Sequence, residues 1–238
     1  MAADKYLMEH AQEPVLRYYG WKPAALSLGK SQRQLADIQL KACQARGIEL
    51  VRRPSGGKTV LHSDELTYSI IFKNIFLKGG ILECYRLISS AIVAGLKKPE
   101  LKLAPHKRSK TKGTNCFIEL SPFEVAYKGK KLIGSAQTRT RKAVLQHGSI
   151  LLDIDYDLWR MVWPNIKNSS TKEFRMTSLK GLGYDYSSIQ QLSDLISPKI
   201  AELFSLEIEI LPFSPAEIKK ISQAEAEFKL AYQDFLNA

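Results

Sequence analysis

The sequence predicts a mixed α/β (α+β) fold with a largely antiparallel sheet and flanking helices. Short runs rich in β-branched and aromatic residues dominate positions 14–155, whereas apolar residues at helical spacing dominate positions 156–238. Neither a repeat nor a low-complexity linker separates these two parts. The chain has 238 residues, of which 45% are hydrophobic and 25% charged, so we expect residues 1–238 to form a single domain around one core.

The first third of the chain is predicted to contain strands around one helix. Residues 14–27 alternate between apolar and polar side chains around a Gly-Trp-Lys-Pro turn, which predicts an antiparallel pair of strands. Residues 32–46 carry apolar side chains at helical spacing before Gly47, which predicts a helix. Residues 48–52 and 59–62 are expected to form short strands on either side of the loop RRPSGGK.

The middle of the chain continues this pattern. The run LTYSIIF predicts a strand, and residues 81–98 have the spacing of an amphipathic helix that ends near two lysines. Residues 102–112 carry basic side chains without an acid or an apolar face, which predicts an exposed basic loop. Three further strands are then expected at residues 116–120, at residues 122–139 with a turn at Lys128-Gly129-Lys130, and at residues 143–154.

The last third is predicted to be mostly helical. Residues 186–204 form one expected helix. Another helix is expected to begin with Ser214 as N-cap, Pro215 as the first helical residue and Glu217 as the partner in a capping box. Between these helices, residues 205–213 alternate like a half-buried strand.

The formal net charge of +11 predicts attraction to polyanions or acidic proteins. Basic nucleic-acid-binding proteins share such a charge, but the sequence carries no RNP-like, zinc-finger or helix-turn-helix signature. No apolar run reaches the roughly 20 residues of a membrane-spanning helix, and the first residues lack the apolar core of a signal peptide. We therefore expect a cytoplasmic protein that uses neither a membrane nor nucleic acid as its partner.

The three cysteines, Cys43, Cys84 and Cys116, are an odd number without C-x-x-C spacing, which argues against a disulfide framework and a structural zinc site. Cys43 and Cys84 fall within predicted helices, where small packed thiols are expected. Cys116 follows a basic loop, where nearby cations would favour the thiolate that acts as a nucleophile, although a buried structural cysteine fits the same pattern. Histidine, cysteine and carboxylate residues show no repeated ligand spacing, so no metal site is expected.

Candidate functional residues concentrate in four segments: RRPSGGKTVLH at 52–62, NCF at 115–117, GKKLIGSAQTR at 129–139 and LQHGS at 145–149. Glycine N–H groups and arginine forks suit a carboxylate, phosphate or carbonyl, although a Gly-Gly pair is also typical of a plain tight turn. Lys131 lies in a predicted strand beside small residues that leave room for a ligand, although an ordinary surface lysine fits the same position. His62 and His147 have side chains able to orient a substrate, shuttle protons or serve as structural hydrogen-bond donors.

The order and combination of these segments, over about residues 17–155, resemble the biotin and lipoate protein ligase and transferase superfamily. Within it, the sequence is most similar to the cysteine-dependent octanoyltransferases. Lys58 stands where many ATP-dependent ligases have a third glycine, the run ELTYSI is like that of the transferases, and Cys116 occupies the place of their nucleophile. Members usually have a strand before the first helix, whereas this chain begins with MAADKYLMEH, expected to lie in that helix.

The resemblance implies a biotin/lipoate ligase-like catalytic domain that transfers an octanoyl group from acyl carrier protein to a lysine of a lipoyl domain or of glycine-cleavage H protein. Cys116 is the implied nucleophile, which holds the acyl group as a thioester without a cofactor. Lys131 is implied to contact the acyl carbonyl and assist proton transfer. The implied substrate-binding residues are Arg52, Arg53, Ser55, Gly56, Gly57, His62, Gly134, Ser135, Gln137, His147 and Gly148.

Three alternatives remain open from the sequence. An ATP-dependent lipoate-protein ligase of the same fold would use ATP and Mg, with lipoyl-adenylate at RRPSGGK and Lys131. We expect this chain to lack the accessory domain that many ligases carry, which argues against this alternative. An amidotransferase would move octanoyl between two proteins through the same thiol. A noncatalytic basic protein would bind nucleic acid or another anionic partner through residues 97–112.

Overall fold

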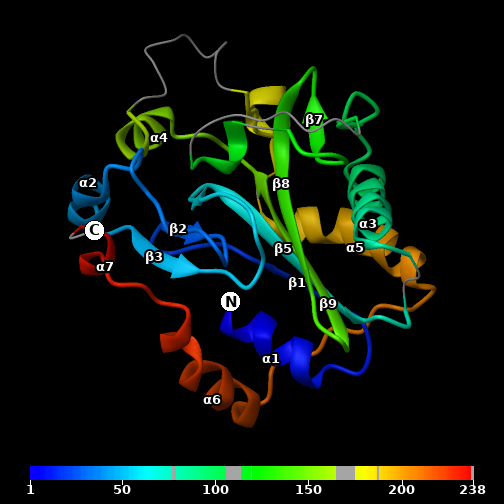
Figure 1. The fold of residues 1–238 in the computed structure, drawn as a ribbon. Coiled ribbons are helices and arrows are strands. Elements are labelled where there is room, and N and C mark those ends of the chain that lie inside the picture. The colour runs from blue at the N-terminus through cyan, green and yellow to red at the C-terminus, as the bar shows by residue number, and fades with distance from the viewer. Residues whose placement is uncertain (77–78, 106–113, 119, 165–174, 187, 237–238) are drawn as a thin grey trace.

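The computed structural model describes residues 1–76, 79–105, 114–118, 120–164, 175–186 and 188–236. It contains a six-stranded sheet, a separate three-stranded sheet and helices packed around them (Figure 1). Every strand pairing in the larger sheet is antiparallel. The predicted mixed fold with a largely antiparallel sheet and flanking helices is therefore confirmed.

The larger sheet has the strand order β1-β5-β9-β8-β7-β6. Its strands in that order are β1 (Val15–Tyr19), β5 (Glu65–Lys73), β9 (Ala143–Leu151), β8 (Lys130–Arg139), β7 (Val125–Tyr127) and β6 (Lys102–Leu103). In the smaller sheet, β2 (Ala25–Leu28) pairs in parallel with β3 (Glu49–Arg52) and antiparallel with β4 (Val60–His62).

Strands β1 and β2 do not pair with each other, so the antiparallel pair predicted for residues 14–27 is wrong. Strand β1 pairs with β5 at one end of the larger sheet, whereas β2 lies in the centre of the smaller sheet. All four residues of β2 are buried, while those of β1 are half-buried. Alternation alone cannot distinguish these two environments, because each strand is locally compatible with either sheet.

The central strands divide their side chains between two faces of the sheet, as the period of two requires. On β5, Leu66, Tyr68 and Ile70 pack into a hydrophobic cluster with residues of α3 (Ile81–Leu96) and α5 (Ile189–Phe204). Thr67, between them, points to the opposite face. Because α5 joins this cluster, part of the helix-rich last third packs on the strand-rich part of the chain.

The remaining helices lie around the smaller sheet and along one edge of the molecule (Figure 1). Their bounds are α1 (Ala2–His10), α2 (Leu40–Ala45), α4 (Tyr156–Val162), α6 (Pro215–Gln223) and α7 (Gln233–Leu236), and the 3-10 turns are η1 (Cys116–Ile118), η2 (Lys180–Leu182) and η3 (Glu225–Glu227). The predicted helices at 81–98 and 186–204 are confirmed. The capping box at Ser214 and Glu217 also forms as predicted.

Three local predictions differ from the structure. Helix α2 is shorter than the predicted 32–46, because residues 31–39 form turns and irregular chain. Residues 116–118 form the 3-10 turn η1 rather than a strand. Residues 205–213 form no strand, and Ile210 and Leu211 are exposed. A strand needs a paired neighbour, which the alternating pattern by itself does not supply.

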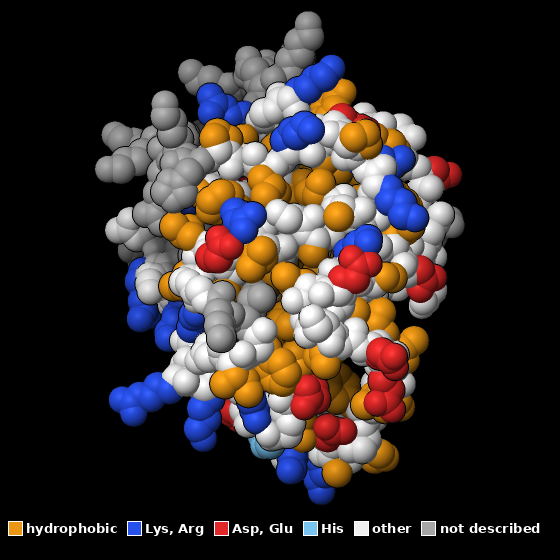
Figure 2. Space-filling view, turned by 90° about the vertical axis from the view of Figure 1, so that its right-hand side faces the viewer, with side chains coloured by type: hydrophobic (Ala, Val, Ile, Leu, Met, Phe, Trp, Pro, Cys, Tyr) orange, Lys and Arg blue, Asp and Glu red, His pale blue; other side chains and the backbone are white. Residues whose placement is uncertain are grey.

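The surface mixes charges of both signs. Figure 2 shows the face that includes α3 and α5, where Lys and Arg side chains are interspersed with Asp, Glu and apolar side chains. The predicted basic loop at 102–112 begins with β6, and its positions 106–113 lie outside the described residues. Among the helices of the described part of the chain, none combines the length and hydropathy needed to cross a membrane.

Candidate active site

A pocket lies between the two sheets and brings together most of the segments singled out in the sequence. Strands β2 and β4 contribute one wall, and strands β5, β8 and β9 contribute the other. The lining residues are Met1, Ser27, Arg53, Val60, His62, Thr67, Cys116, Gly134, Ser135, Ala136, His147, Gly148 and Ser149. Cys116 is thus the cysteine that reaches this pocket.

Cys116 is fixed by its own backbone neighbours. Its N–H donates to the carbonyl of Thr59, just before β4, at 2.9 Å. The side chain of Asn115 accepts a hydrogen bond from the N–H of Phe117 at 2.8 Å, which stabilises the 3-10 turn η1. The NCF segment therefore presents the thiol from a fixed turn at the end of the Gly-rich loop rather than from a strand.

Lys131 approaches Cys116 from β8. Its side chain is buried, and its Nζ atom donates to the carbonyl oxygen of Cys116 at 2.9 Å and lies 3.7 Å from the Sγ atom. The backbone around Lys131 is held by hydrogen bonds to Arg175 and Thr177. The structure thus brings together Cys116, the nucleophile implied by the resemblance, and Lys131, which the resemblance implies to contact the acyl carbonyl and assist proton transfer.

Glu124 completes this cluster and was not found by the sequence analysis. Its Oε1 atom lies 2.7 Å from Nζ of Lys131, and both side chains are about 1% exposed. The N–H of Ser121 donates to the other carboxylate oxygen at 2.7 Å. The sequence did contain one signal for it, a single acid within the apolar run around β7. An acid in such a run is expected to be buried, and a buried carboxylate requires a charged or hydrogen-bonding partner.

The surroundings of Lys131 determine its charge. Burial by itself lowers the pKa of a lysine, but the attraction of Cys116 and of the Glu124 carboxylate outweighs burial and raises the pKa of Lys131 above its ordinary value. The side chain is therefore an ammonium ion at neutral pH. In this form it can stabilise a thiolate or an oxyanion.

The other two cysteines lie in hydrophobic clusters, as expected for packed thiols. Cys43 packs in the cluster around the smaller sheet, and burial raises the pKa of its thiol to about 11. Cys84 is buried on α3 within the cluster under the larger sheet. Within the described residues, no group of three or more His, Cys, Asp and Glu side chains is arranged to hold a metal ion.

The two arginines at the start of the Gly-rich loop have different positions. Arg53 lines the pocket, and its guanidinium group donates to the carbonyl oxygens of Ser27, Gly56 and Lys58 at 2.7–2.8 Å. Arg52 lies outside the pocket lining and donates to backbone carbonyls of the loop after β2 at 2.8–3.4 Å. Both arginines shape the loop.

The glycines and Ser55 of this loop lie outside the pocket lining. Gly57 has a φ of +100°, and a Cβ atom there would lie 2.8 Å from the Arg53 guanidinium group. The hydroxyl of Ser55 lies 2.6 Å from Nε2 of His147, which lines the pocket from β9. Burial lowers the pKa of His147 to about 4, so this imidazole is neutral at physiological pH.

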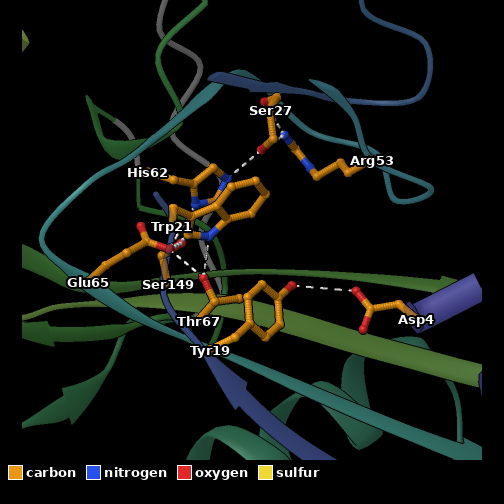
Figure 3. Close-up of polar contacts among 9 residues, drawn as sticks. All are labelled: Asp4, Tyr19, Trp21, Ser27, Arg53, His62, Glu65, Thr67 and Ser149. Atoms are coloured by element: carbon orange, nitrogen blue, oxygen red, sulfur yellow. Dashed lines mark hydrogen bonds and ion pairs between the residues drawn. The ribbon is translucent and has the colours of Figure 1, made fainter. Parts of the chain in front are cut away.

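His62 belongs to a second polar cluster at the same pocket, drawn in Figure 3. Its Nε2 atom lies 2.7 Å from the hydroxyl of Ser27, and its Nδ1 atom lies 2.8 Å from Oε1 of Glu65. Trp21 stacks on the imidazole with 4.2 Å between ring centroids. Ser27 and Glu65 were not identified from the sequence, since they are separated from each other by 38 positions and lie in unrelated motifs.

Strands β8 and β9 contribute small residues to the pocket. A Cβ atom on Gly134 would lie 3.0–3.3 Å from Phe117 and Lys131, so this glycine gives space to the Lys131 side chain as well as to a ligand. A Cβ atom on Gly148 would lie 2.5–2.7 Å from Ser135, Gly134 and Tyr68. Gln137 is bonded to Gln146 at 3.0 Å and lies outside the pocket lining.

The structure places the predicted site residues in two groups. The pocket is lined by Arg53, His62, Cys116, Gly134, Ser135, His147 and Gly148. Lys131 lies next to Cys116, while the predicted substrate-binding residues outside the lining are Arg52, Ser55, Gly56, Gly57 and Gln137. A role in binding substrate stays a prediction for all of them.

Residues 1–201 match the family model of the lipoyl protein ligase A/B catalytic domain. The chain belongs to this family. It is 34% identical to the octanoyltransferase LipM of Kyrpidia tusciae, over 97% of this chain and 90% of that protein. It is 31% identical to the octanoyltransferase LipM of Staphylococcus aureus, over 96% of this chain and 91% of that protein. These relatives confirm the predicted acyltransferase class and the resemblance to the lipoate ligase and transferase superfamily.

Solved structures show the same fold at lower sequence identity. Lipoate-protein ligase A bound with ATP superposes with a TM-score of 0.76 and 18% identity, over 98% of this chain and 89% of that chain. The bipartite lipoate protein ligase of Thermoplasma acidophilum superposes with a TM-score of 0.72 and 19% identity, over 98% of this chain and 87% of that chain. At such identities, these matches establish the fold and leave the activity to the site.

Proposed function

We propose that this protein transfers an octanoyl group from acyl carrier protein, through a thioester on Cys116, to a lysine of a lipoyl domain or of glycine-cleavage H protein. The observation that carries the proposal is the Lys131 ammonium group 3.7 Å from the Cys116 sulfur in a pocket between the sheets. The choice of octanoyl as the transferred group rests on the LipM relatives, which are octanoyltransferases and match along nearly the whole chain.

In the first step, the Cys116 thiolate attacks the carbonyl carbon of the donor thioester. A carbon–sulfur bond to Cys116 forms, the donor's carbon–sulfur bond breaks, and its electron pair stays on the donor sulfur. Lys131 stabilises the negative charge as it moves from the Cys116 sulfur to the carbonyl oxygen. Such an electrostatic contact contributes roughly 3 to 4 kcal/mol per donor in oxyanion sites.

In the second step, the lysine amine of the acceptor attacks the acyl-enzyme. A carbon–nitrogen bond forms, and the carbon–sulfur bond to Cys116 breaks. Exchange between thioesters is nearly isoenergetic, and amide formation is downhill, so the route requires neither ATP nor another cofactor. This distinguishes it from a ligase, which activates a free acid with ATP and Mg.

The charge of the chain suits the proposed partners. A net charge of +11 attracts acidic protein domains, and we expect carrier proteins and lipoyl domains to be acidic. Attraction of this kind accelerates encounter and weakens with salt. We place the reaction in the cytoplasm, where both partners would be soluble.

The proposal is tested by acyl transfer with purified components. Unaltered protein is incubated with a lipoyl domain and either octanoyl acyl carrier protein without ATP, or octanoate with ATP and Mg. Modification of the lipoyl domain is followed by intact mass. We expect modification with the carrier-protein donor and its loss in Cys116→Ser.

Two results would contradict the proposal. Modification only with free acid and ATP, retained in Cys116→Ser, would identify a ligase. Modification from an already octanoylated protein, but not from the carrier protein, would identify an amidotransferase that uses the same thiol.

A further inference from the structure

We infer that Arg33 and Arg52 bind the phosphate of the donor's prosthetic arm on the outer side of the pocket wall, while the thioester end of the arm reaches Cys116. An acyl carrier protein presents its acyl group on a pantetheine arm, and the far end of this arm is a phosphodiester linked to the protein. The inference rests on the proposed function and adds to it a binding site for this phosphate. It starts from two arginines that lie together without an acidic partner.

The guanidinium groups of Arg33 and Arg52 repel each other. Burial and the positive charge of Arg33 both lower the pKa of Arg52. Among the described residues, no carboxylate forms an ion pair with either arginine. Like charges held close together cost free energy unless an opposite charge lies near them. The pair therefore suits an anion that binds from outside the protein.

Arg52 is fixed in place but keeps unused donors. Its Nη1 atom donates to the carbonyl oxygens of Gly29 at 3.0 Å, Lys30 at 3.4 Å and Gln32 at 2.8 Å. Its Nε and Nη2 atoms donate to no atom of the residues that the structure describes, and the same holds for the exposed side chain of Arg33. A guanidinium group presents five N–H donors in a planar fork that matches the oxygens of a phosphate. An anchored and an exposed arginine thus offer donors at the same place.

The arginine pair lies beside the pocket, because the loops that carry it begin in the pocket wall. Ser27 lines the pocket, and the loop of Arg33 starts two residues later at Gly29. Arg53 lines the pocket as well and directly follows Arg52. Since Arg33 is exposed and Arg52 is half-buried, the pair faces the outer side of this wall.

The loop of Arg33 is packed against the Gly-rich loop. A Cβ atom on Gly29 would lie 2.0 Å from the carbonyl oxygen of Gly57, so this approach requires a glycine at position 29. At the far end of the Gly-rich loop, the carbonyl of Thr59 accepts the N–H of Cys116 at 2.9 Å. The Gly-rich loop therefore connects the arginine pair with the nucleophile.

The two ends of the donor arm suit the two ends of this loop. The phosphodiester is charged and stays on the exposed side, whereas the acyl thioester enters the pocket, where Nζ of Lys131 lies 3.7 Å from the Cys116 sulfur. Hydrogen bonds from arginine to a phosphate are roughly twice as strong as those between neutral groups. Binding energy from such a remote group holds the thioester in position for attack.

The experiment compares two small donors that differ only in the phosphate. Octanoyl phosphopantetheine and octanoyl pantetheine are each incubated with the full chain without ATP, and the rate constant for acyl-enzyme formation is measured by intact mass. The readout is the ratio of the two rate constants, in which a general loss of activity cancels. The variants are Arg33→Gln and Arg33→Glu, because Arg52 also holds the loop after β2. Arg46→Gln, at an exposed position after α2, is the matched control.

We expect the phosphate to raise the rate constant about 10- to 100-fold in the unaltered protein, as hydrogen bonds between charged groups would. Arg33→Gln is expected to lower this ratio about fivefold or more. Arg33→Glu is expected to bring the ratio to about one or below, because its carboxylate repels the phosphate. Arg46→Gln is expected to keep the ratio of the unaltered protein.

The phosphorylated arm occurs in two kinds of donor, acyl carrier protein and coenzyme A. Faster acylation by octanoyl acyl carrier protein than by octanoyl coenzyme A, with both rates lowered in Arg33→Gln, assigns the site to the arm of the carrier protein. Faster acylation by octanoyl coenzyme A overturns that assignment.

Other outcomes overturn the phosphate site itself. Equal rate constants for the two small donors in the unaltered protein contradict it, and so does a ratio that Arg33→Gln leaves unchanged. An effect of Arg33→Gln confined to modification of a lipoyl domain by octanoate with ATP and Mg would assign the arginines to a nucleotide instead. If no donor acylates Cys116 in the unaltered protein, the proposed function fails. Failure of the phosphate site alone leaves acylation by octanoyl acyl carrier protein intact, so the two failures differ.

Discussion

The Nζ atom of Lys131 lies 3.7 Å from the Sγ atom of Cys116, across the space between strand β8 and the turn η1. The contact depends on a buried lysine that stays charged, because Glu124 lies 2.7 Å from the same ammonium group. A positive charge held this close stabilises negative charge that develops at this site during acyl transfer. The geometry therefore supplies both a nucleophile and the means to stabilise it.

The first prediction concerns the reactivity of Cys116. Replacing Lys131 with Met removes the cation but keeps most of the side-chain volume, so the alkylation rate of Cys116 by iodoacetamide at pH 7 is expected to fall on the order of tenfold or more. The site of alkylation is located by peptide mass spectrometry. Lys102→Met, at an exposed position on β6, is the matched control and is expected to react normally.

The second prediction concerns the buried ion pair. Glu124→Gln leaves the Lys131 ammonium group buried without its carboxylate, and we expect the free energy of unfolding to fall by about 3 to 5 kcal/mol. Urea denaturation measures this loss. The double variant Glu124→Gln with Lys131→Met should regain part of it, because no unpaired charge remains. A double variant that loses the sum of both single effects would contradict a coupled pair.

The third prediction concerns pH. Burial lowers the pKa of His147 to about 4 in the folded protein, against about 6.5 for an ordinary histidine. Between these values the unfolded chain binds a proton that the folded protein does not, so the free energy of unfolding falls as pH drops from about 6.5 to about 4, by up to about 3 kcal/mol. Above about pH 6.5 the His147 imidazole is neutral in both states, so it no longer changes the free energy of unfolding as pH rises.

The matched variant for the pH prediction is His147→Gln, which cannot titrate but can still bond to Ser55. Denaturation curves at several pH values should show a shallower loss of stability for the variant between pH 6.5 and 4. If the free energy of unfolding falls equally steeply with pH in the two proteins, His147 titrates alike in the folded and unfolded states, which contradicts the prediction.

The fourth prediction concerns the Gly-rich loop. Arg53→Ala removes hydrogen bonds to the buried carbonyl of Ser27 and to the part-buried carbonyls of Gly56 and Lys58, so these acceptors lose a charged donor. We expect the free energy of unfolding to fall by roughly 2 to 4 kcal/mol and backbone hydrogen exchange in the loop to accelerate. Arg46→Ala, at an exposed position after α2, is expected to change both by little.

Much of the fold could be predicted from the sequence because its signals are local. The capping box at Ser214 and the amphipathic spacing of α3 are examples, since neighbouring residues specify each feature. The partners of β1 and β2 could not be predicted, because pairing depends on strands far away in the chain. Residues 205–213 were predicted as a strand for the same reason. Their alternating pattern suits a strand, but it does not show whether another strand lies beside them to pair with.

The candidate site divides in a similar way. Cys116 and Lys131 could be proposed because the order and combination of their segments resemble the octanoyltransferases. A cysteine after a basic loop and a lysine among small residues are weak signals by themselves. Glu124, Ser27 and Glu65 did not stand out, because their roles depend on contacts between elements. Three-dimensional contact also separates Arg53, which reaches the pocket, from its neighbour Arg52, which does not.

The most direct test of the account is the intact mass of the protein after incubation with octanoyl acyl carrier protein in the absence of ATP. We expect one added octanoyl group, removed by hydroxylamine, located on Cys116 and absent in Cys116→Ser. No adduct on the unaltered protein, or an adduct of the same lability in Cys116→Ser, would contradict the thioester on which the account depends.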